Sequence, residues 1–363
     1  MGFNCGVVGL PNVGKSTIFN ALTAAGAASE NFPFCTIEPN VGIAAVPDPR
    51  LKRLAEISGS EKILATTLEV VDIAGLVKGA SKGEGLGNKF LGHIRQVDAI
   101  AHVVRCFDDQ NIAHVSGAVD PVSDIEVIRT ELLLADIETV EKRIAACEKG
   151  KKSGDKKLIE GLPRYNALLE KMNAGMSARG AMEGEDASFY RDLFLITAKP
   201  LLYVCNVTEN ELGRETDKMA EVRKIAESDK APVIEICGKI ESEISELDEH
   251  DKHEFLADLG LAESGLDRFI REGYRILNLI TYFTTGPKET RAWTVTKGSK
   301  APQAAGVIHS DFERGFIRAE IMAFDDLDKL GSEQAVKEKG LLRIEGKDYV
   351  IQDGDVAHFR FNV

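Results

Sequence analysis

Short apolar, β-branched runs recur along the chain, and polar or helix-compatible segments separate them. A strand that is covered on both faces consists of a continuous run of apolar residues, whereas a half-exposed strand alternates between apolar and polar residues. Runs of this kind, interleaved with helices, predict an α/β fold with a mainly parallel sheet and helices on both of its faces. The predicted strands are Phe3 to Val8, Leu68 to Val71, Ala99 to Val104, Pro200 to Cys205 and Pro232 to Ile236.

A stretch of different character, from about Ile125 to Phe194, predicts a helical domain inserted into this fold. Apolar residues recur there in two stripes at heptad spacing, one on each side of a turn rich in lysine and glycine. We expect an antiparallel hairpin whose stripes form either an exposed coiled coil or the core faces of a packed bundle. Ser123 and Glu126 form a predicted capping box at its start, and Pro163 should kink the second helix or delay its beginning. The stripes are Leu133, Ile137, Val140, Ile144 and Cys147, and then Leu158, Leu162, Tyr165, Leu169 and Met172.

Past about Asn278 the chain changes to short segments that alternate between apolar and polar residues, which predicts a small mixed domain rich in strands. A chain of 363 residues is longer than one ordinary hydrophobic core supports. We therefore divide it into a central α/β domain (residues 1–124 and 197–277), an inserted helical hairpin domain (125–196) and a C-terminal domain (278–363).

The charge balance argues against adhesion to nucleic acid through net charge. Lysine and arginine number 45 against 58 acidic residues, so the formal net charge is −13. Any contact with nucleic acid must therefore use a local basic patch. The turn from Lys149 to Lys157 is such a patch, and it is either a solvated loop or a tip that contacts phosphates.

Cysteine usage and the lack of long apolar segments indicate a cytoplasmic protein. The six cysteines are scattered without a C-x-x-C pair, so they are interpreted as reduced core thiols and not as metal ligands. The sequence contains no charged leader and no apolar segment of membrane-spanning length. We expect no association with membranes.

Residues Gly9 to Thr17, with the sequence GLPNVGKST, form a phosphate-binding loop between the first predicted strand and a helix-compatible stretch. The glycines let the backbone curl so that successive N–H groups point at phosphates. Lys15 adds a charge at the β- and γ-phosphate oxygens, and Ser16 offers its hydroxyl to Mg²⁺. The chain is expected to bind a nucleoside triphosphate with Mg²⁺. The predicted contacts come from Asn12, Val13, Gly14, Lys15, Ser16 and Thr17.

Two further segments carry the residue types of a nucleotide switch. Thr36 is placed to reach Mg²⁺ and the γ-phosphate from a mobile loop. Asp72 directly follows a predicted strand and is expected to hold Mg²⁺ through water, while the Gly75 N–H meets the γ-phosphate. The glycine-rich stretch from Lys78 to Gly87 is a predicted second switch. Leu76 stands where many GTPases have the glutamine that orients the attacking water, so another group must position that water.

The base-reading loop departs from the guanine pattern. GTPases read guanine with Asn-Lys-x-Asp, whereas this chain has Asn206, Val207, Thr208 and Glu209. Glutamate is one methylene longer than the aspartate that accepts two bonds from guanine, and the packing lysine is lost. We predict that adenine competes well, with Asn206 near its exocyclic amine and Gly238 in a weakened backbone contact to the base.

Together these residues closely resemble the YchF or Obg-like ATPase family of P-loop proteins. The resemblance spans essentially the whole chain, although the helical insert is matched only in character. It implies a GTPase-like domain, an inserted coiled-coil hairpin and a C-terminal TGS domain of β-grasp form. The segments that carry it are the phosphate loop, Asn31 to Asn40, Asp72 to Gly87, Asn206 to Glu209, Arg291 to Thr294 and Ala301 to Gly306.

The resemblance also implies an activity, because the family hydrolyses ATP in preference to GTP and associates with ribosomes. The implied partners are ATP, with GTP weaker, and the ribosome or its large subunit, with RNA contacts through Lys149 to Lys157 and the TGS domain. His114 matches a loop histidine implicated in hydrolysis. Asn12 resembles an asparagine that helps bind K⁺ in cation-dependent relatives. The implied catalytic residues are His114, Lys15, Asn12 and Gly75.

Two alternative functions remain open at this point. The first is a guanine-specific translation-type GTPase, which tighter binding of GTP than of ATP would favour. The second is a ribosome-binding regulatory module with incidental hydrolysis, which full ribosome binding by a Lys15→Ala variant would support.

Overall fold

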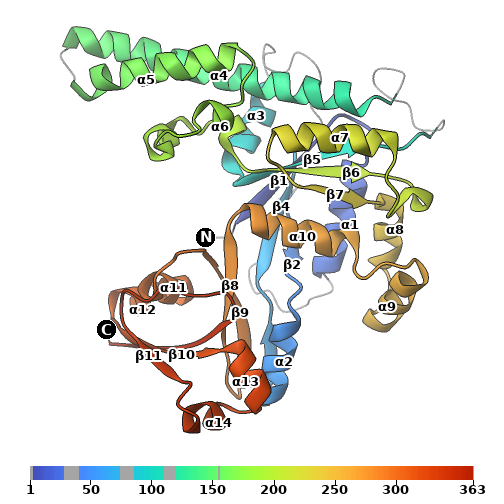
Figure 1. Ribbon diagram of the computed structural model, residues 1–363, viewed down its shortest axis with the longest axis vertical. Helices are drawn as coiled ribbons and strands as arrows, with labels where there is room; N and C mark the ends of the chain where they lie inside the picture. The colour runs from blue at the N-terminus through green and yellow to red at the C-terminus, as the bar shows by residue number, and fades with distance from the viewer. Residues whose placement is uncertain (1–2, 28–40, 74–85, 110–118, 154–155, 363) are drawn as a thin grey trace.

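The computed structural model describes residues 3–27, 41–73, 86–109, 119–153 and 156–362. Figure 1 shows a long helical hairpin at the top, a first sheet with its helices in the middle, and a second sheet below. Among the helices of the described ranges, none combines the length and the apolar character needed to cross a membrane.

The first sheet has six strands in the order β2-β4-β1-β5-β6-β7. Neighbouring strands pair in parallel, except that β2 runs antiparallel to β4 at the edge. The prediction of a mainly parallel sheet is therefore confirmed. The apolar pattern misses β2, because its glycine and alanines carry little β propensity. The strands are β1 (Asn4–Val8), β2 (Val41–Ala45), β4 (Thr67–Asp72), β5 (Ala99–Arg105), β6 (Leu201–Asn206) and β7 (Val233–Ile236).

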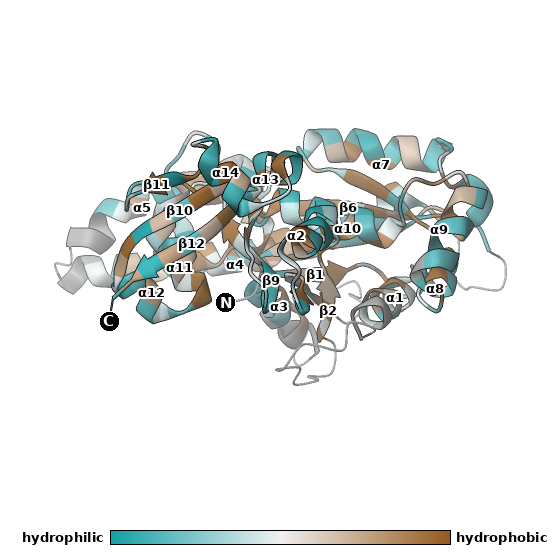
Figure 2. Ribbon diagram, turned by 90° about the horizontal axis from the view of Figure 1, so that it is seen from below, coloured by the Kyte–Doolittle hydropathy of each residue, from teal (hydrophilic) through white to brown (hydrophobic). Residues whose placement is uncertain are grey.

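Helices cover both faces of this sheet (Figure 1), and its strands are largely hydrophobic (Figure 2). Ile18 and Leu22 of α1 and Ile94 of α3 are buried against the strands. Burial of each such side chain contributes roughly 1.5–3 kcal/mol. Helices α1 (Lys15–Ala27), α8 (Gly238–Ile244) and α10 (Gly265–Ile276) lie on one face, and α3 (Leu86–Gln96), α4 (Pro121–Ser153) and α7 (Asp217–Ser228) lie on the other. Helix α9 (Glu249–Asp258) follows α8.

The insert is a helical hairpin formed by α4 and α5 (Lys156–Asn173). The predicted stripes meet along their seam, where Val140, Cys147 and Tyr165 are buried. Tyr190 and Leu193 of the short helix η1 (Ala187–Leu193) join the same cluster. This part of the hairpin is therefore a packed bundle and not a two-helix coiled coil alone. Helices α6 (Ala178–Ala181) and η2 (Ile196–Ala198) complete the insert.

One local prediction for the hairpin is wrong, and so is one of the two alternatives for its second helix. Helix α4 begins at Pro121, and the Ser123 N–H donates to Asp120 Oδ1 at 3.1 Å, so Asp120 caps the helix in place of the Ser123 box. Proline suits the first helical position because the N–H it lacks would have no helical partner there. Of the two alternatives for Pro163, the delayed start is wrong, because helix α5 runs through this residue, whereas the kink stays a prediction.

A buried carboxylate fixes the point at which the insert returns to the sheet. Asp136 of α4 is fully buried and accepts bonds from the N–H groups of Ile196 and Thr197, both at 2.7 Å. The Thr197 hydroxyl donates to the same carboxylate at 2.7 Å. Burial raises the pKa of Asp136, while these donors lower it by stabilising the charged form. The carboxylate thereby satisfies the backbone at the start of η2.

The second sheet also has six strands, in the order β11-β10-β12-β8-β9-β3. Helix α11 packs on one face, with Ala301 and Ala304 against Tyr282 and Ile321, which is the helix-on-sheet arrangement expected for a β-grasp fold. The strands are β3 (Lys62–Leu64), β8 (Leu279–Thr284), β9 (Glu289–Thr296), β10 (Phe316–Ala323), β11 (Arg343–Glu345) and β12 (Asp355–Phe361). The helices are α2 (Pro49–Ser58), α11 (Ala301–Ile308), α12 (Ser310–Arg314), α13 (Phe324–Leu330) and α14 (Glu333–Glu338).

One segment of the N-terminal part belongs to this second sheet. Strand β3 pairs in parallel with β9, and α2 packs on the sheet face that α11 leaves open. Leu51 and Leu54 of α2 are buried there with Phe283 and Met322. The sequence pattern does not predict this pairing, because β3 is three residues long and its partner is distant in sequence.

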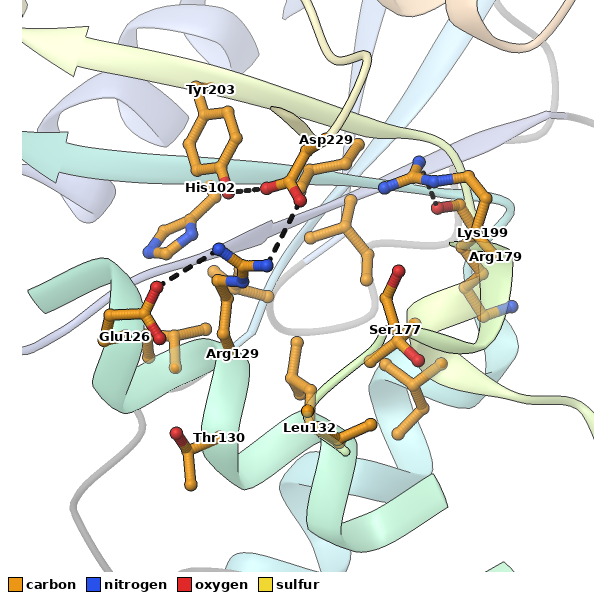
Figure 3. Close-up of a pocket in the computed structure, with 18 residues that line it drawn as sticks. His102, Glu126, Arg129, Thr130, Leu132, Ser177, Arg179, Lys199, Tyr203 and Asp229 are labelled. Atoms are coloured by element: carbon orange, nitrogen blue, oxygen red, sulfur yellow. Dashed lines mark hydrogen bonds and ion pairs between the residues drawn. The ribbon is translucent and has the colours of Figure 1, made fainter. Parts of the chain in front are cut away.

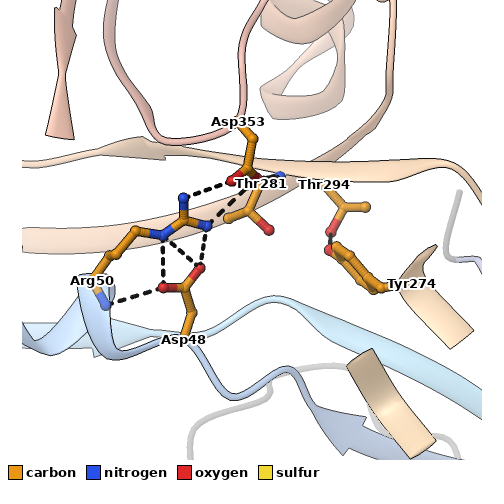
Figure 4. Close-up of polar contacts among 6 residues, drawn as sticks. All are labelled: Asp48, Arg50, Tyr274, Thr281, Thr294 and Asp353. Carbon is orange, nitrogen blue, oxygen red and sulfur yellow. Dashed lines mark hydrogen bonds and ion pairs between the residues drawn. The ribbon is translucent and has the colours of Figure 1, made fainter. Parts of the chain in front are cut away.

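A polar clamp reinforces the same junction (Figure 4). Arg50 of α2 donates to Asp48 at 2.7 Å and to Asp353 of the C-terminal part at 2.7 Å. Asp353 also accepts the backbone N–H of Thr281 at 2.9 Å. These contacts raise the pKa of Arg50, with the hydrogen bond to Asp48 as the largest cause, although burial opposes them. The clamp thus joins α2 to the start of β8 through one carboxylate.

Replacement of Asp353 by alanine should lower the free energy of unfolding by about 1–2 kcal/mol. The change removes an ion pair and leaves the Thr281 N–H without its acceptor. Urea denaturation followed by fluorescence measures the difference. Asp348→Ala is the matched control, because Lys300 is the one ion-pair partner of Asp348 in the described part of the chain and the Asp348 side chain is 92% exposed. Equal midpoints for the two variants would contradict a structural role for the clamp.

Candidate nucleotide-binding site

The phosphate-binding loop connects β1 to α1 and requires glycine at two positions. A Cβ on Gly9 would lie 2.5 Å from the Val103 carbonyl oxygen. Gly14 has φ +96°, and a Cβ there would lie 2.1 Å from Asn206 Nδ2. Asn12 also adopts the left-handed conformation, with φ 62°. Any side chain at either glycine position would therefore displace a neighbouring strand or loop.

Lys15 lies inside this loop at the start of α1. Its side chain is buried, and Nζ donates to the Leu10 carbonyl oxygen at 2.8 Å. Burial lowers the pKa of Lys15, while the charge of Asp72 opposes that shift. Ser16 and Thr17 follow at the exposed beginning of the helix, where free N–H groups and the helix dipole favour an anion.

Asp72 is the last residue of β4 and has the character of a metal-binding carboxylate. Its Oδ1 is buried and has no hydrogen-bond partner in the described part of the chain. Burial raises the pKa of Asp72, while the charge of Lys15 lowers it. A buried carboxylate oxygen without a donor suits a hydrated Mg²⁺, which binds carboxylates while keeping several waters. The residues therefore fit that ion.

Several predicted site residues lie outside the described ranges. They are Thr36, Gly75, Leu76, His114 and most of the glycine-rich stretch that begins at Lys78. Their predicted roles stay predictions.

Asn206 ends β6 and joins two loops through its side-chain amide. Its Nδ2 donates to the Val13 carbonyl oxygen at 2.9 Å, and its Oδ1 accepts the Gly238 N–H at 3.2 Å. The residue is 5% exposed. The amide therefore holds the phosphate loop at a fixed distance from the loop after β7. One N–H and one lone pair remain for the base contact predicted from the sequence.

A cavity of about 770 Å³ opens beside these loops, within the size range of nucleotide and cofactor sites. Its walls come from the phosphate loop and from the segments that follow β5, β6 and β7, at the carboxyl edge where parallel sheets bind ligands. Glu209 is an exposed wall residue, whereas Val207 is buried in the core beneath it. The lining residues predicted from sequence are Asn12, Gly14, Thr17, Asn206, Val207, Glu209 and Gly238.

The sequence interpretation missed the wall after β5. Phe107, Asp108 and Asp109 line the cavity there. Arg105 holds this wall, because its guanidinium donates to the carbonyl oxygens of Phe107 and Asp109, each at 3.1 Å. The only signal in the sequence is that these residues follow a buried strand, which places them at the binding edge of the sheet.

Comparisons with known proteins agree with this geometry. A family model described as a 50S ribosome-binding GTPase matches residues 4–142. The model named YchF-GTPase_C, described as a protein of unknown function, matches residues 279–362.

Full-length relatives are similar along the whole chain. The ribosome-binding ATPase YchF of Bacillus subtilis strain 168 is 56% identical over 366 residues, with 100% of each chain covered. The protein of that name from Escherichia coli O157:H7 is 54% identical over 365 residues, again with 100% of each covered. The solved structure of the Schizosaccharomyces pombe YchF GTPase superposes with a TM-score of 0.88 at 39% identity, covering 99% of this chain and 97% of that one. The chain therefore belongs to the YchF family.

Proposed function

We propose that this protein is a Mg²⁺-dependent ATP hydrolase that binds the ribosome and prefers ATP to GTP. The observation that carries the proposal is the cavity beside the phosphate loop, whose base end presents Glu209 where guanine readers have aspartate. The relatives named ribosome-binding ATPase support it. Ribosome binding in turn supports a cytoplasmic location.

The residues divide between phosphates, metal and base. Backbone N–H groups of Asn12 to Thr17 surround the phosphates, and Lys15 exchanges its bond to the Leu10 carbonyl oxygen for phosphate oxygens. Ser16, Thr36 and Asp72 hold Mg²⁺, which neutralises charge on the β- and γ-phosphate oxygens when it is bound. Asn12 is the proposed contact for K⁺.

Base choice rests on the loop after β6. Asn206 keeps its remaining N–H and lone pair for the base, while the longer Glu209 side chain displaces the carboxylate that guanine requires. Isothermal titration with ATP and GTP tests the proposal directly. The guanine-specific alternative predicts tighter binding of GTP than of ATP. It is the second candidate because one matching family model and one similar solved structure are named GTPase.

A Glu209→Asp variant should gain affinity for GTP by about tenfold relative to ATP, because the shorter carboxylate reaches the two guanine donors. Val207 is left unchanged, since a lysine at this buried position would destabilise the core. Titration of both nucleotides gives the ratio. Glu246→Asp is the control, because Glu246 is exposed and does not line the cavity. An unchanged ratio in Glu209→Asp would remove Glu209 from base selection.

Hydrolysis requires a group that positions water, and we assign this role to His114 because Leu76 cannot donate or accept a hydrogen bond. His114→Ala should lower kcat by about 10²–10⁴-fold while the Kd for ATP stays the same. Single-turnover hydrolysis and titration separate the two quantities. The exposed His250→Ala serves as control. Wild-type kcat in His114→Ala, alone and with ribosomes, would exclude His114.

The ribosome contact is assigned to the basic end of the hairpin, together with the C-terminal sheet. Helix α4 is 33 residues long, so it carries the turn about 50 Å along its axis. Figure 1 shows the hairpin extending past the edge of the first sheet. The lysine-rich sequence of this turn has the opposite sign to the net charge of the chain, which supports a phosphate contact there.

Replacing Lys151, Lys152, Lys156 and Lys157 by glutamine should weaken co-sedimentation with ribosomes and reduce its salt dependence. A variant that makes fewer phosphate contacts releases fewer counterions when it binds, so its affinity depends less on salt. The matched control replaces four exposed lysines away from the tip and from the second sheet, Lys142, Lys171, Lys224 and Lys230. If the tip variant and the control bound with the same affinity and the same salt slope, the contact would lie elsewhere.

A change of nucleotide at the first sheet can reach the C-terminal sheet only through elements that contact both, and residues 46–66 form such an element. Strand β2 begins five residues after Thr36 and β4 ends at Asp72, so the two strands that flank this segment lead to proposed metal-binding residues. Within it, α2 and β3 are built into the second sheet. We infer that nucleotide exchange at the first sheet displaces this segment and thereby the C-terminal sheet.

A further inference from the structure

A second cavity, of about 210 Å³, lies between the first sheet and the helical insert (Figure 3). Strands β1, β5 and β6 form one wall, and α4 with the segment from Ser177 to Lys199 forms the other. It shares no lining residue with the nucleotide cavity. Most of its lining is apolar, from residues such as Ile100, Leu132 and Ile196.

Both carboxylates in the lining are already engaged. Arg129 of α4 pairs with Glu126 at 3.1 Å and with Asp229 at 3.3 Å. The Tyr203 hydroxyl donates to Asp229 at 2.7 Å. Figure 3 shows these four side chains as one continuous set of contacts along one side of the cavity. The charge of Arg129 is therefore neutralised, and Glu126 and Asp229 are both occupied by this pairing.

Two lining cations, Arg179 and Lys199, make no ion pair with this set, and the Lys199 ammonium already donates to the carbonyl oxygens of Arg95 and Val97. The Arg179 guanidinium donates to the Lys199 carbonyl oxygen at 3.0 Å, and no carboxylate of the described chain lies within ion-pair distance of it. Burial lowers the pKa of Arg179, with Asp229 as the charge that opposes the shift. A guanidinium carries five N–H donors in a planar fork that matches a carboxylate. Most of these donors therefore remain available at the cavity wall.

His102 supplies a second polar group. It is 3% exposed, lines the cavity from β5, and makes no hydrogen bond within the described ranges. Burial lowers its pKa to about 3, so its ring is neutral, with one donor and one acceptor nitrogen. A buried polar ring without a partner is costly unless a bound molecule or water satisfies it.

We propose that this cavity binds a small organic carboxylate of single-ring size. The carboxylate pairs with Arg179, the apolar body packs on Ile100, Leu132 and Ile196, and His102 provides a hydrogen bond. The volume fits, because an apolar protein cavity of about 150 Å³ already accepts benzene. The ligand needs only one anionic group, which pairs with Arg179, because Arg129 is already paired with Glu126 and Asp229.

The position of the cavity gives such a ligand contact with two parts of the molecule. His102 pairs in register with Val8, the residue before Gly9 of the phosphate loop. Arg179 and Arg129 belong to the insert. A bound acid therefore touches the nucleotide sheet and the helical insert at once.

Benzoate and its neutral isostere benzamide test the proposal on the full-length protein. Titration should detect benzoate, with benzamide at least tenfold weaker. Arg179→Met should weaken benzoate at least tenfold, whereas Arg179→Lys, which keeps the charge, should retain much of the affinity. Arg214→Met is the control, because Arg214 is exposed and does not line the cavity.

A second readout locates the ligand without any substitution. The His102 ring protons in the NMR spectrum of the wild-type protein should shift with benzoate and not with benzamide. This measurement stands even if Arg179→Met does not fold. The proposal is overturned if benzoate fails to bind at 10 mM, if benzamide binds equally well, or if the His102 signals do not move.

Discussion

The structure depends on one shared segment. The chain leaves the first sheet at the end of β2, forms α2 and β3 within the second sheet, and returns to the first sheet as β4. Burial of Leu51 and Leu54 beneath the C-terminal strands removes apolar surface from water, and the Arg50 to Asp353 contact adds a directed bond. Neither sheet can change its position without moving this segment.

Buried side chains also hold the loops of the nucleotide site in place. Asn206 links the phosphate loop to the loop after β7, and Arg105 holds the wall after β5. Each uses a buried side chain to satisfy backbone groups of a segment that lines the cavity, and such groups are costly to leave unpaired. A nucleotide would therefore meet walls that are already oriented, so less conformational entropy is lost on binding.

Local signals in the sequence predicted what depends on local chemistry. The buried strands, the phosphate loop and the paired stripes of the insert follow from residue types at short spacing, and the structure contains them. Strand β3 has no local signal, because its stability comes from β9 far along the chain. The double role of Asn206 also required the fold, since its partners Val13 and Gly238 are brought to it only by strand order. Asp120 replaced Ser123 as the cap because several polar residues near Pro121 could begin the helix, and sequence alone does not choose among them.

We propose that the shared segment makes the nucleotide state observable far from the phosphates. Amide hydrogen exchange of α2 and β3 is the direct measurement, since exchange reports the local free energy of opening. We expect the exchange rates of residues 49–64 to differ by about tenfold between the complexes with ADP and with a non-hydrolysable ATP analogue, a difference of about 1.4 kcal/mol in opening free energy. Changes confined to the phosphate loop and the cavity walls, with residues 49–64 unaltered, would contradict the transmission of the nucleotide state to the C-terminal sheet.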